Sequence, residues 1–174
     1  IVTLQISGLS AILAFSIGFL LALMRISSYQ FLKDIATVYI AIIRGTPLLV
    51  QIFIFYFIIA TIFELERFLA GAISLGLFFG AYIAEVLRGA IQSIDKGQYE
   101  AAKSLGMNYF QTMVYIVMPQ ALKRALPTLV GEMIALVKDS SLVSVISITD
   151  LTKVGREIVA NTFSPFETWL IIAA

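Results

Sequence analysis

The stretch DKGQYEAAKSLGMNYFQ, residues 95–111, is the most polar segment of a chain that is otherwise mostly apolar. Asp95 followed by Gln98 has the spacing of a capping box, in which two side chains satisfy free N–H groups at a helix start. We expect a short helix from there to Leu105. Gly106 is placed to end it, because glycine readily takes the left-handed conformation that closes many helices.

A second helix start follows this glycine. Asn108 with Gln111 repeats the capping spacing, which predicts another short helix. Pro119 and Pro127 then mark the return of the chain to apolar surroundings, because proline interrupts helical hydrogen bonding. The segment is therefore predicted to be a hairpin of two short helices between apolar regions.

Composition places the chain among membrane proteins. Of its 174 residues, 60% are apolar and 13% are charged, whereas soluble domains have roughly 45–50% and about 25%. The chain has no cysteine and no histidine, so we expect no disulfide, no imidazole base and no metal site. It contains no G-x-x-x-x-G-K-[ST] loop, so ATP binding by that route is not expected. The net charge of +1 gives no sign of a nucleic-acid partner.

Several apolar runs are long enough to cross a bilayer, which takes about 20 residues in a helix. The chain starts and ends inside such runs. We therefore expect one all-α transmembrane domain over residues 1–174, cut at both ends from a longer protein, with about five transmembrane helices. The predicted spans are residues 2–24, 46–63, 68–87 and 126–148, with a fifth that begins near Phe166.

The stretch from Gln30 to Ile43 has two readings. It either extends the second span or lies along the membrane surface as an amphipathic helix. Thr46 can cap the start of a new helix, and Pro47 suits the first helical position, where no N–H is needed. With Gly45 before them, these residues favour a surface helix followed by a new span.

Basic residues are unevenly distributed among the predicted loops. The loops that follow the first and third predicted spans (loops one and three) hold, with their flanks, seven basic residues. The loops that follow the second and fourth spans (loops two and four) hold three. Because cytoplasmic loops carry an excess of Lys and Arg, the hairpin is predicted to face the cytoplasm. The seven are Arg25, Lys33, Arg88, Lys96, Lys103, Lys123 and Arg124, and the three are Arg67, Lys153 and Arg156.

Apolar side chains beside the hairpin turn suggest a partner groove, because an isolated loop would be polar there. Ala101 and Ala102 have almost no side chain, so another backbone could approach them closely. The alternative is a hairpin that folds back on its own helix ends, and spacing alone leaves both open. The apolar residues concerned are Leu105, Met107, Tyr109 and Phe110.

The segment EAAKSLGMNYFQTMVYIVMPQA, residues 100–121, resembles the EAA loop of permease subunits in binding-protein-dependent ABC importers. That signature has Glu-Ala-Ala, a glycine four residues after the second alanine, and a later Leu/Ile/Met-Pro. The segment IRGTPLLVQ, residues 43–51, resembles one typical of the polar amino-acid branch. The matching residues are Glu100, Ala101, Ala102, Gly106, Met118 and Pro119 in the loop, and Arg44, Gly45, Thr46 and Pro47 in the second segment.

The resemblance implies a permease of a bacterial inner or plasma membrane that alternates between outward and inward openings. It implies a second permease subunit, identical or different, and a solute-binding protein outside the cell. A cytoplasmic ABC ATPase dimer would bind the ATP, so this chain would be no enzyme and hold no cofactor. The loop at about residues 95–127 would dock on that ATPase through Glu100, Ala101, Ala102, Leu105, Gly106, Met107 and Pro119.

Small residues in the third span are candidates for helix packing. Ala72, Gly76, Gly80 and Ala84 recur at four-residue spacing, which lets helix backbones approach closely in lipid. Gly80 is also a candidate to leave room for substrate. On the same span, Glu85 and Arg88 are three residues apart and are predicted to pair.

The fourth span carries a polar cluster that is a candidate substrate pathway. Counting ~1.5 Å per residue from Pro127 places Lys138 about 17 Å into the membrane, where a charge must face protein or water. Lys138 and Asp139 either neutralise each other or line the route of a zwitterion. The cluster consists of Lys138, Asp139, Ser141 and Ser144.

Other charged residues have weaker assignments. Arg44 is either a phosphate-level anchor or, as we prefer, a link between loop one and the hairpin. Asp150, Arg156 and Glu157 are expected outside, in a docking surface or a solvated loop. The alternatives for function are a permease for another solute, such as a peptide or an inorganic anion, and an ion-coupled secondary transporter.

Overall fold

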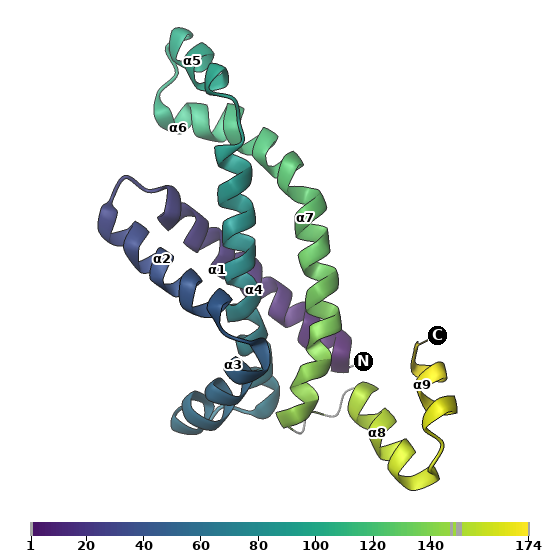
Figure 1. Cartoon of the computed structure of the whole chain (residues 1–174). Helices are drawn as coiled ribbons and strands as arrows, with labels where there is room; N and C mark the ends of the chain where they lie inside the picture. Colours follow the sequence, from purple (N-terminus) through teal and green to yellow (C-terminus); the bar gives the residue numbers. More distant parts are fainter. Residues whose placement is uncertain (1, 147, 149–150, 174) are drawn as a thin grey trace.

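The computed structural model describes residues 2–146, 148 and 151–173. Within these residues the chain forms helices and no strand, which confirms the all-α prediction (Figure 1). Three long helices, α1 (Val2–Ile26), α4 (Arg67–Gln92) and α7 (Met118–Asp139), form the main body. The shorter helices are α2 (Gln30–Gly45), α3 (Leu48–Ile54), α5 (Lys96–Ser104), α6 (Tyr109–Gln111), α8 (Leu151–Thr162) and α9 (Pro165–Ala173).

The packing of α1 along α4 is the centre of the fold. A methyl group on Gly76 would lie 2.7 Å from Cβ of Leu13, so the two backbones meet at a distance that only glycine permits. Nearby, the buried Ser10 hydroxyl donates to the carbonyl of Ala72 at 3.1 Å. Lipid gives helices no hydrophobic reason to associate, so close contact and hydrogen bonding must hold them. The predicted packing role of the small residues is confirmed.

Two helices of the described part are long and apolar enough to cross a membrane, α1 and α4. They agree with the predicted spans 2–24 and 68–87. The number rises to three if α2 and Leu48–Ala60, which form a bent pair, count as one span. α7 is not among them, because it carries five charged side chains: Lys123, Arg124, Glu132, Lys138 and Asp139.

The predicted break before the second span is confirmed, with different local chemistry. α2 and the helix Leu48–Ala60 meet at 109°. Thr46 does not cap the new helix, because its hydroxyl donates backwards to the carbonyl of Ile42 at 3.0 Å, and Pro47 precedes the helix instead of opening it. Leu48–Ala60 is only about 20 Å long, so the prediction of a complete span at residues 46–63 was wrong.

The sequence predicted that Pro119 and Pro127 interrupt the helix between the hairpin and the next span. In the structure, neither proline does so. α6 runs through a π-helical turn, Thr112–Val117, directly into α7, and a 3₁₀ segment, Ser140–Ile146, follows. The π-helical turn, which is wider than an α-helical turn, comes just before Pro119. Proline has no backbone N–H to donate to a carbonyl of the preceding turn. Pro127 lies inside α7. Helical structure is therefore continuous where two breaks were expected.

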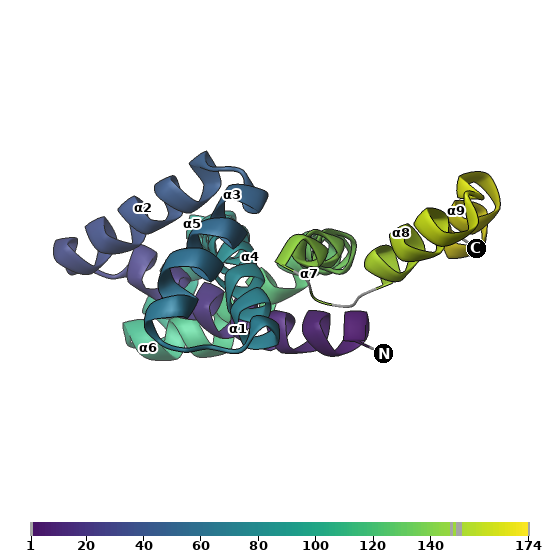
Figure 2. The same cartoon turned by 90° about the horizontal axis from the view of Figure 1, so that it is seen from below.

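The C-terminal helices α8 and α9 stand apart from the main body (Figures 1 and 2). They pack on each other where Gly155 of α8 lies against Ile172 and Trp169 of α9. The expected start of an apolar helix near Phe166 agrees with α9. The separate helix α8 was not predicted.

Candidate functional site: the α5–α6 hairpin and the end of α7

The hairpin formed by α5 and α6 projects beyond the ends of α4 and α7 (Figure 1). Asp95 caps α5, its Oδ1 accepting from the amide of Gly97 at 2.6 Å. Gln98 does not complete the predicted capping box, because its Oε1 accepts instead from Nε2 of Gln120 at 3.0 Å. α5 ends at Ser104. The hairpin is thus closed by a contact with α7 that sequence spacing did not reveal.

The turn between the two helices is as predicted. Gly106 has φ +76°, in the left-handed region that glycine enters without strain. Asn108 Oδ1 accepts from the amide of Gln111 at 2.8 Å, and Gln111 Oε1 accepts from the amide of Asn108 at 2.9 Å. This is a complete capping box. Both local signals are confirmed.

The hairpin presents large apolar side chains to its surroundings. Leu105 is 80% exposed and Phe110 is 72% exposed, whereas Met107 is half-buried. Ala101 is exposed, but Ala102 is only 2% exposed and packs inside the hairpin. The expectation that both alanines are open to a partner was therefore wrong for Ala102, because adjacent helical residues point about 100° apart.

The remaining hairpin candidates lie at the surface. Glu100 and Pro119 are both exposed. The half-buried Tyr99, next to Glu100 in the sequence, packs against the main apolar core. Burial, with a smaller effect of Tyr109, raises the pKa of the Tyr99 phenol, so the phenol stays neutral.

Gly80 lies in the packing surface between α1 and α4. A methyl group there would stand 2.9 Å from Cγ2 of Ile17. Gly71, nine residues earlier on α4, faces Val143 of the 3₁₀ segment. Gly80 is thus about 13 Å further along α4, and the structure does not bring it together with the polar cluster that follows α7.

Lys138 and Asp139 are the last two residues of α7. Lys138 is exposed and Asp139 is half-buried. None of the three ion pairs in the described part of the chain involves either residue, which gives no support to mutual neutralisation. The predicted depth of Lys138 was counted from Pro127, which lies inside α7, so that count does not measure a distance into the membrane.

The two serines of the cluster lie on the 3₁₀ segment. Ser141 is half-buried and Ser144 is buried. Arg156 of α8 donates to Oγ of Ser144 at 3.3 Å, so a residue assigned to the outer loop reaches back to the cluster. Asp150, assigned to the same loop, lies outside the described residues.

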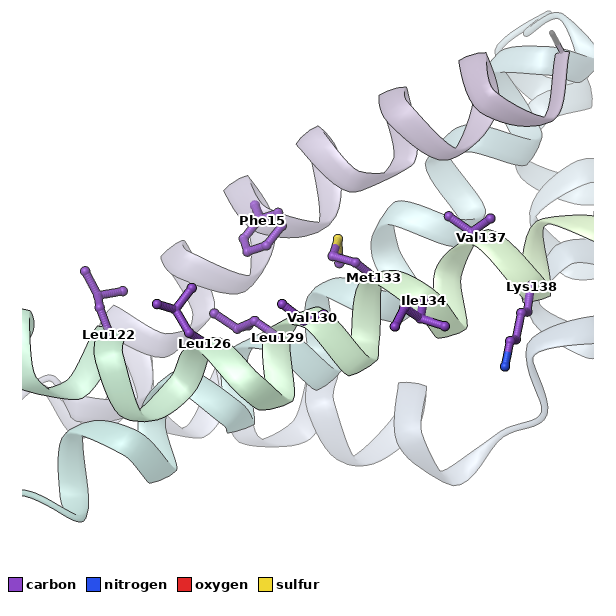
Figure 3. Close-up of a pocket in the computed structure, with 9 residues that line it drawn as sticks. All are labelled: Phe15, Leu122, Leu126, Leu129, Val130, Met133, Ile134, Val137 and Lys138. Atoms are coloured by element: carbon purple, nitrogen blue, oxygen red, sulfur yellow. The ribbon is translucent and has the colours of Figure 1, made fainter.

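An apolar groove runs between α1 and α7 (Figure 3). Its volume is about 660 Å³. Among the described residues that line it, Lys138 is the only charged one, and its amino group points away from the other side chains (Figure 3). Such a lining offers a polar amino acid almost no hydrogen bonds. The groove is lined by Phe15, Leu122, Leu126, Leu129, Val130, Met133, Ile134, Val137 and Lys138.

Arg44 is placed differently from our preferred reading. Its guanidinium carbon lies 5.0 Å from the centre of the Tyr82 ring on α4, a cation–π contact. The end of α2 that carries Arg44 lies away from α5 and α6 (Figure 1). The predicted link between loop one and the hairpin was therefore wrong, because Arg44 serves the contact with α4.

Residues 14–174 match the family described as the binding-protein-dependent transport system inner membrane component. The chain belongs to this family. Members are the membrane-spanning permease components of ABC transporters, so the resemblance stated from the EAA loop is confirmed.

Two relatives in this family are both described as glutamine transport system permease proteins. The putative glutamine transport system permease protein GlnP of Rickettsia prowazekii is 39% identical, over 99% of this chain and 80% of that protein. The glutamine transport system permease protein GlnP of Escherichia coli strain K12 is 38% identical, over 98% of this chain and 80% of that protein.

Solved permease structures share the fold. A crystal structure of an amino acid ABC transporter with histidines matches with a TM-score of 0.90 and 42% identity, over 98% of this chain and 80% of that one. The MetNI methionine ABC transporter, in an inward-facing form, matches with a TM-score of 0.80 at 19% identity, over 99% of this chain and 83% of that one. The second likeness concerns the fold alone.

Proposed function

We propose that this chain is the permease subunit of an ATP-driven importer of polar amino acids. The observation that carries the proposal is the projecting hairpin, whose exposed Leu105 and Phe110 flank a glycine turn. Apolar side chains on a segment outside the membrane body need a partner groove to leave water. The hairpin is the coupling element, and its partner is a separate cytoplasmic ABC ATPase that binds the ATP.

Glutamine, or an amino acid of similar polarity, is the proposed substrate. Two relatives at 38–39% identity are described as glutamine permeases, and the structural relative at 42% identity is an amino acid transporter. The candidate contacts are the polar groups at the end of α7 and on the 3₁₀ segment that follows it, namely Lys138, Asp139, Ser141 and Ser144. The apolar groove of Figure 3 is better suited to lipid or to another helix.

The remaining partners follow from the proposed transport cycle. A second permease subunit, of this or a related sequence, completes the pathway across a bacterial inner membrane. A solute-binding protein delivers the amino acid from outside. Opening and closing of the ATPase dimer moves the hairpin, and the helices pass between outward and inward openings. No cofactor is bound by this subunit.

Reconstitution tests this function directly. The full-length subunit is co-purified with its ATPase and placed in liposomes with the solute-binding protein, and uptake of radiolabelled glutamine is measured with and without ATP. We expect uptake that requires ATP and the binding protein and that unlabelled glutamine competes away. Uptake driven by an ion gradient without ATP would instead identify an ion-coupled carrier, and ATP-driven uptake of peptides or anions alone would identify another substrate class.

A further inference from the structure

Arg124 ties the start of α7 to the end of α4. α4 ends at Gln92, and Ser93 follows as its C-terminal cap. One guanidinium nitrogen of Arg124 donates to the carbonyl of Ser93 and also to its hydroxyl, the latter at 3.1 Å. The last carbonyls of a helix lack partners within the helix, and a positive charge is favourable there. The contact therefore satisfies α4 with a group supplied from 31 residues further on.

A second tie lies one turn away on the same face of α7. Gln120 donates to Gln98 of α5 at 3.0 Å and to the carbonyl of Ile116 at 2.9 Å. Residues four apart on a helix lie side by side, so Gln120 and Arg124 together hold both sides of the joint between α4 and α5. Of these two residues, only Arg124 carries a positive charge, and it bonds to the backbone carbonyl of Ser93 at the end of α4.

We infer that Arg124 is a positioning residue for coupling, which holds the end of α4, just before the hairpin, to α7, just after it. This inference rests on the proposed function, in which the ATPase displaces the hairpin. The chain between Ser93 and Asp95 is the only covalent joint between α4 and α5. With Arg124 in place, displacement of the hairpin moves the ends of α4 and α7 together; without it, the joint flexes and α4 lags behind.

The decisive measurement is amino-acid uptake per ATP hydrolysed in liposomes. Arg124→Ala should still assemble with the ATPase and hydrolyse ATP. Uptake per ATP should fall by about tenfold, the change in an equilibrium expected from losing one charge-assisted hydrogen bond. Arg124→Lys keeps a donor and the charge and should restore most of the coupling. Lys123→Ala removes the same charge from the neighbouring exposed position and should leave the ratio unchanged.

A distance measurement separates positioning from simple stabilisation. The chain has no cysteine, so spin labels can be attached through cysteines placed at the exposed positions Gly89 and Lys103. The subunit alone, in nanodiscs, should give a narrow distance distribution that broadens in Arg124→Ala. A purely stabilising role would lower the melting temperature without broadening the distribution or changing uptake per ATP.

The outcomes are distinguishable. An Arg124→Ala subunit with the wild-type distance distribution and wild-type uptake per ATP overturns the inference. If Arg124→Ala does not fold, Arg124→Gln retains one donor and should show partial broadening and partial coupling; wild-type behaviour of that variant also overturns it. A wild-type complex without ATP-driven uptake would overturn the proposed function, and the spin labels would still report whether Arg124 holds the joint.

Discussion

The guanidinium of Arg25 on α1 lies 3.3 Å from the carboxylate of Glu85 on α4. The same carboxylate pairs with Arg88 of its own helix at 2.6 Å, as the spacing had predicted. Arg25 also donates to the hydroxyl of Thr37 on α2. Arg25 therefore joins α1 to both α4 and α2, and Arg88 shares the Glu85 carboxylate from within α4.

Replacing Glu85 should loosen this three-helix contact. Glu85→Gln leaves two guanidinium groups facing each other without a negative charge, and we expect a loss of about 1–2 kcal/mol of unfolding free energy. Thermal unfolding in detergent measures the change, and Glu64→Gln, at an exposed turn, is the control. Equal melting temperatures for the two variants would show that the ion pairs contribute nothing.

Adding bulk between α1 and α4 should be more harmful than adding it elsewhere on α4. Gly76→Val places its Cβ 2.7 Å from that of Leu13, and overpacking of this kind costs about 1–3 kcal/mol. Gly89→Val adds the same side chain at a position where no neighbouring atom of the described residues lies within 4 Å of the added Cβ. The yield and melting temperature of the Gly76 variant should fall well below those of the Gly89 variant; matching values would contradict the packing.

The hairpin turn is the most direct test of coupling. At φ +76°, Gly106→Val places a β-branched side chain in the left-handed region, at a cost of roughly 1–2 kcal/mol. Membrane insertion should be retained, while ATPase co-purification and uptake should fall sharply. Gly106→Asn tolerates this φ better and should retain most of both. Normal co-purification and uptake in the valine variant would refute the role of the hairpin.

Orientation remains a prediction from the distribution of Lys and Arg. Because the chain lacks cysteine, a single one at position 103, in α5, should react with a membrane-impermeant thiol reagent only from the cytoplasmic side. One at position 66, just before α4, should react only from outside. Labelling of intact cells and of inside-out vesicles distinguishes the two sides, and the reverse pattern would invert the topology.

The polar end of α7 is tested by a double replacement. Lys138→Leu combined with Asp139→Leu should still fold and bind the ATPase, because neither side chain forms an ion pair within the described residues. If these groups contact the amino acid, uptake should fall or its selectivity should change. Unaltered rate and selectivity in a stable double variant would remove both residues from the pathway.

Local signals in the sequence predicted part of the local structure. Gly106 and the Asn108–Gln111 pair are confirmed, whereas Asp95 and Gln98 have the same spacing and form no box, because Gln98 bonds to Gln120 of α7 instead. The Pro119 signal failed, because a π-helical turn accommodates the ring and lets the helix continue. The rule that proline interrupts a helix considers one residue alone, so it does not predict a neighbouring π-helical turn that accommodates the proline.

Contacts between distant residues were beyond the reach of spacing. Arg124 was recognised only as a loop cation, because its partner Ser93 lies 31 residues away. Small residues on α4 indicated close packing, but Leu13 became the neighbour of Gly76 only in three dimensions. The role of Lys138 stayed open for the same reason. Its position next to Asp139 in the sequence does not decide which groups its amino group contacts.

The unbroken helix that leaves the hairpin makes α7 a lever arm. α7 itself, Met118–Asp139, is about 33 Å long, so tilting it by about 10° about one end shifts the other by roughly 6 Å. Modest angular motion at the hairpin end, where we propose that the ATPase docks, is thereby magnified at the far end of α7. Lys138 and Asp139, at the far end of α7, would then move by a distance comparable to the length of an amino acid.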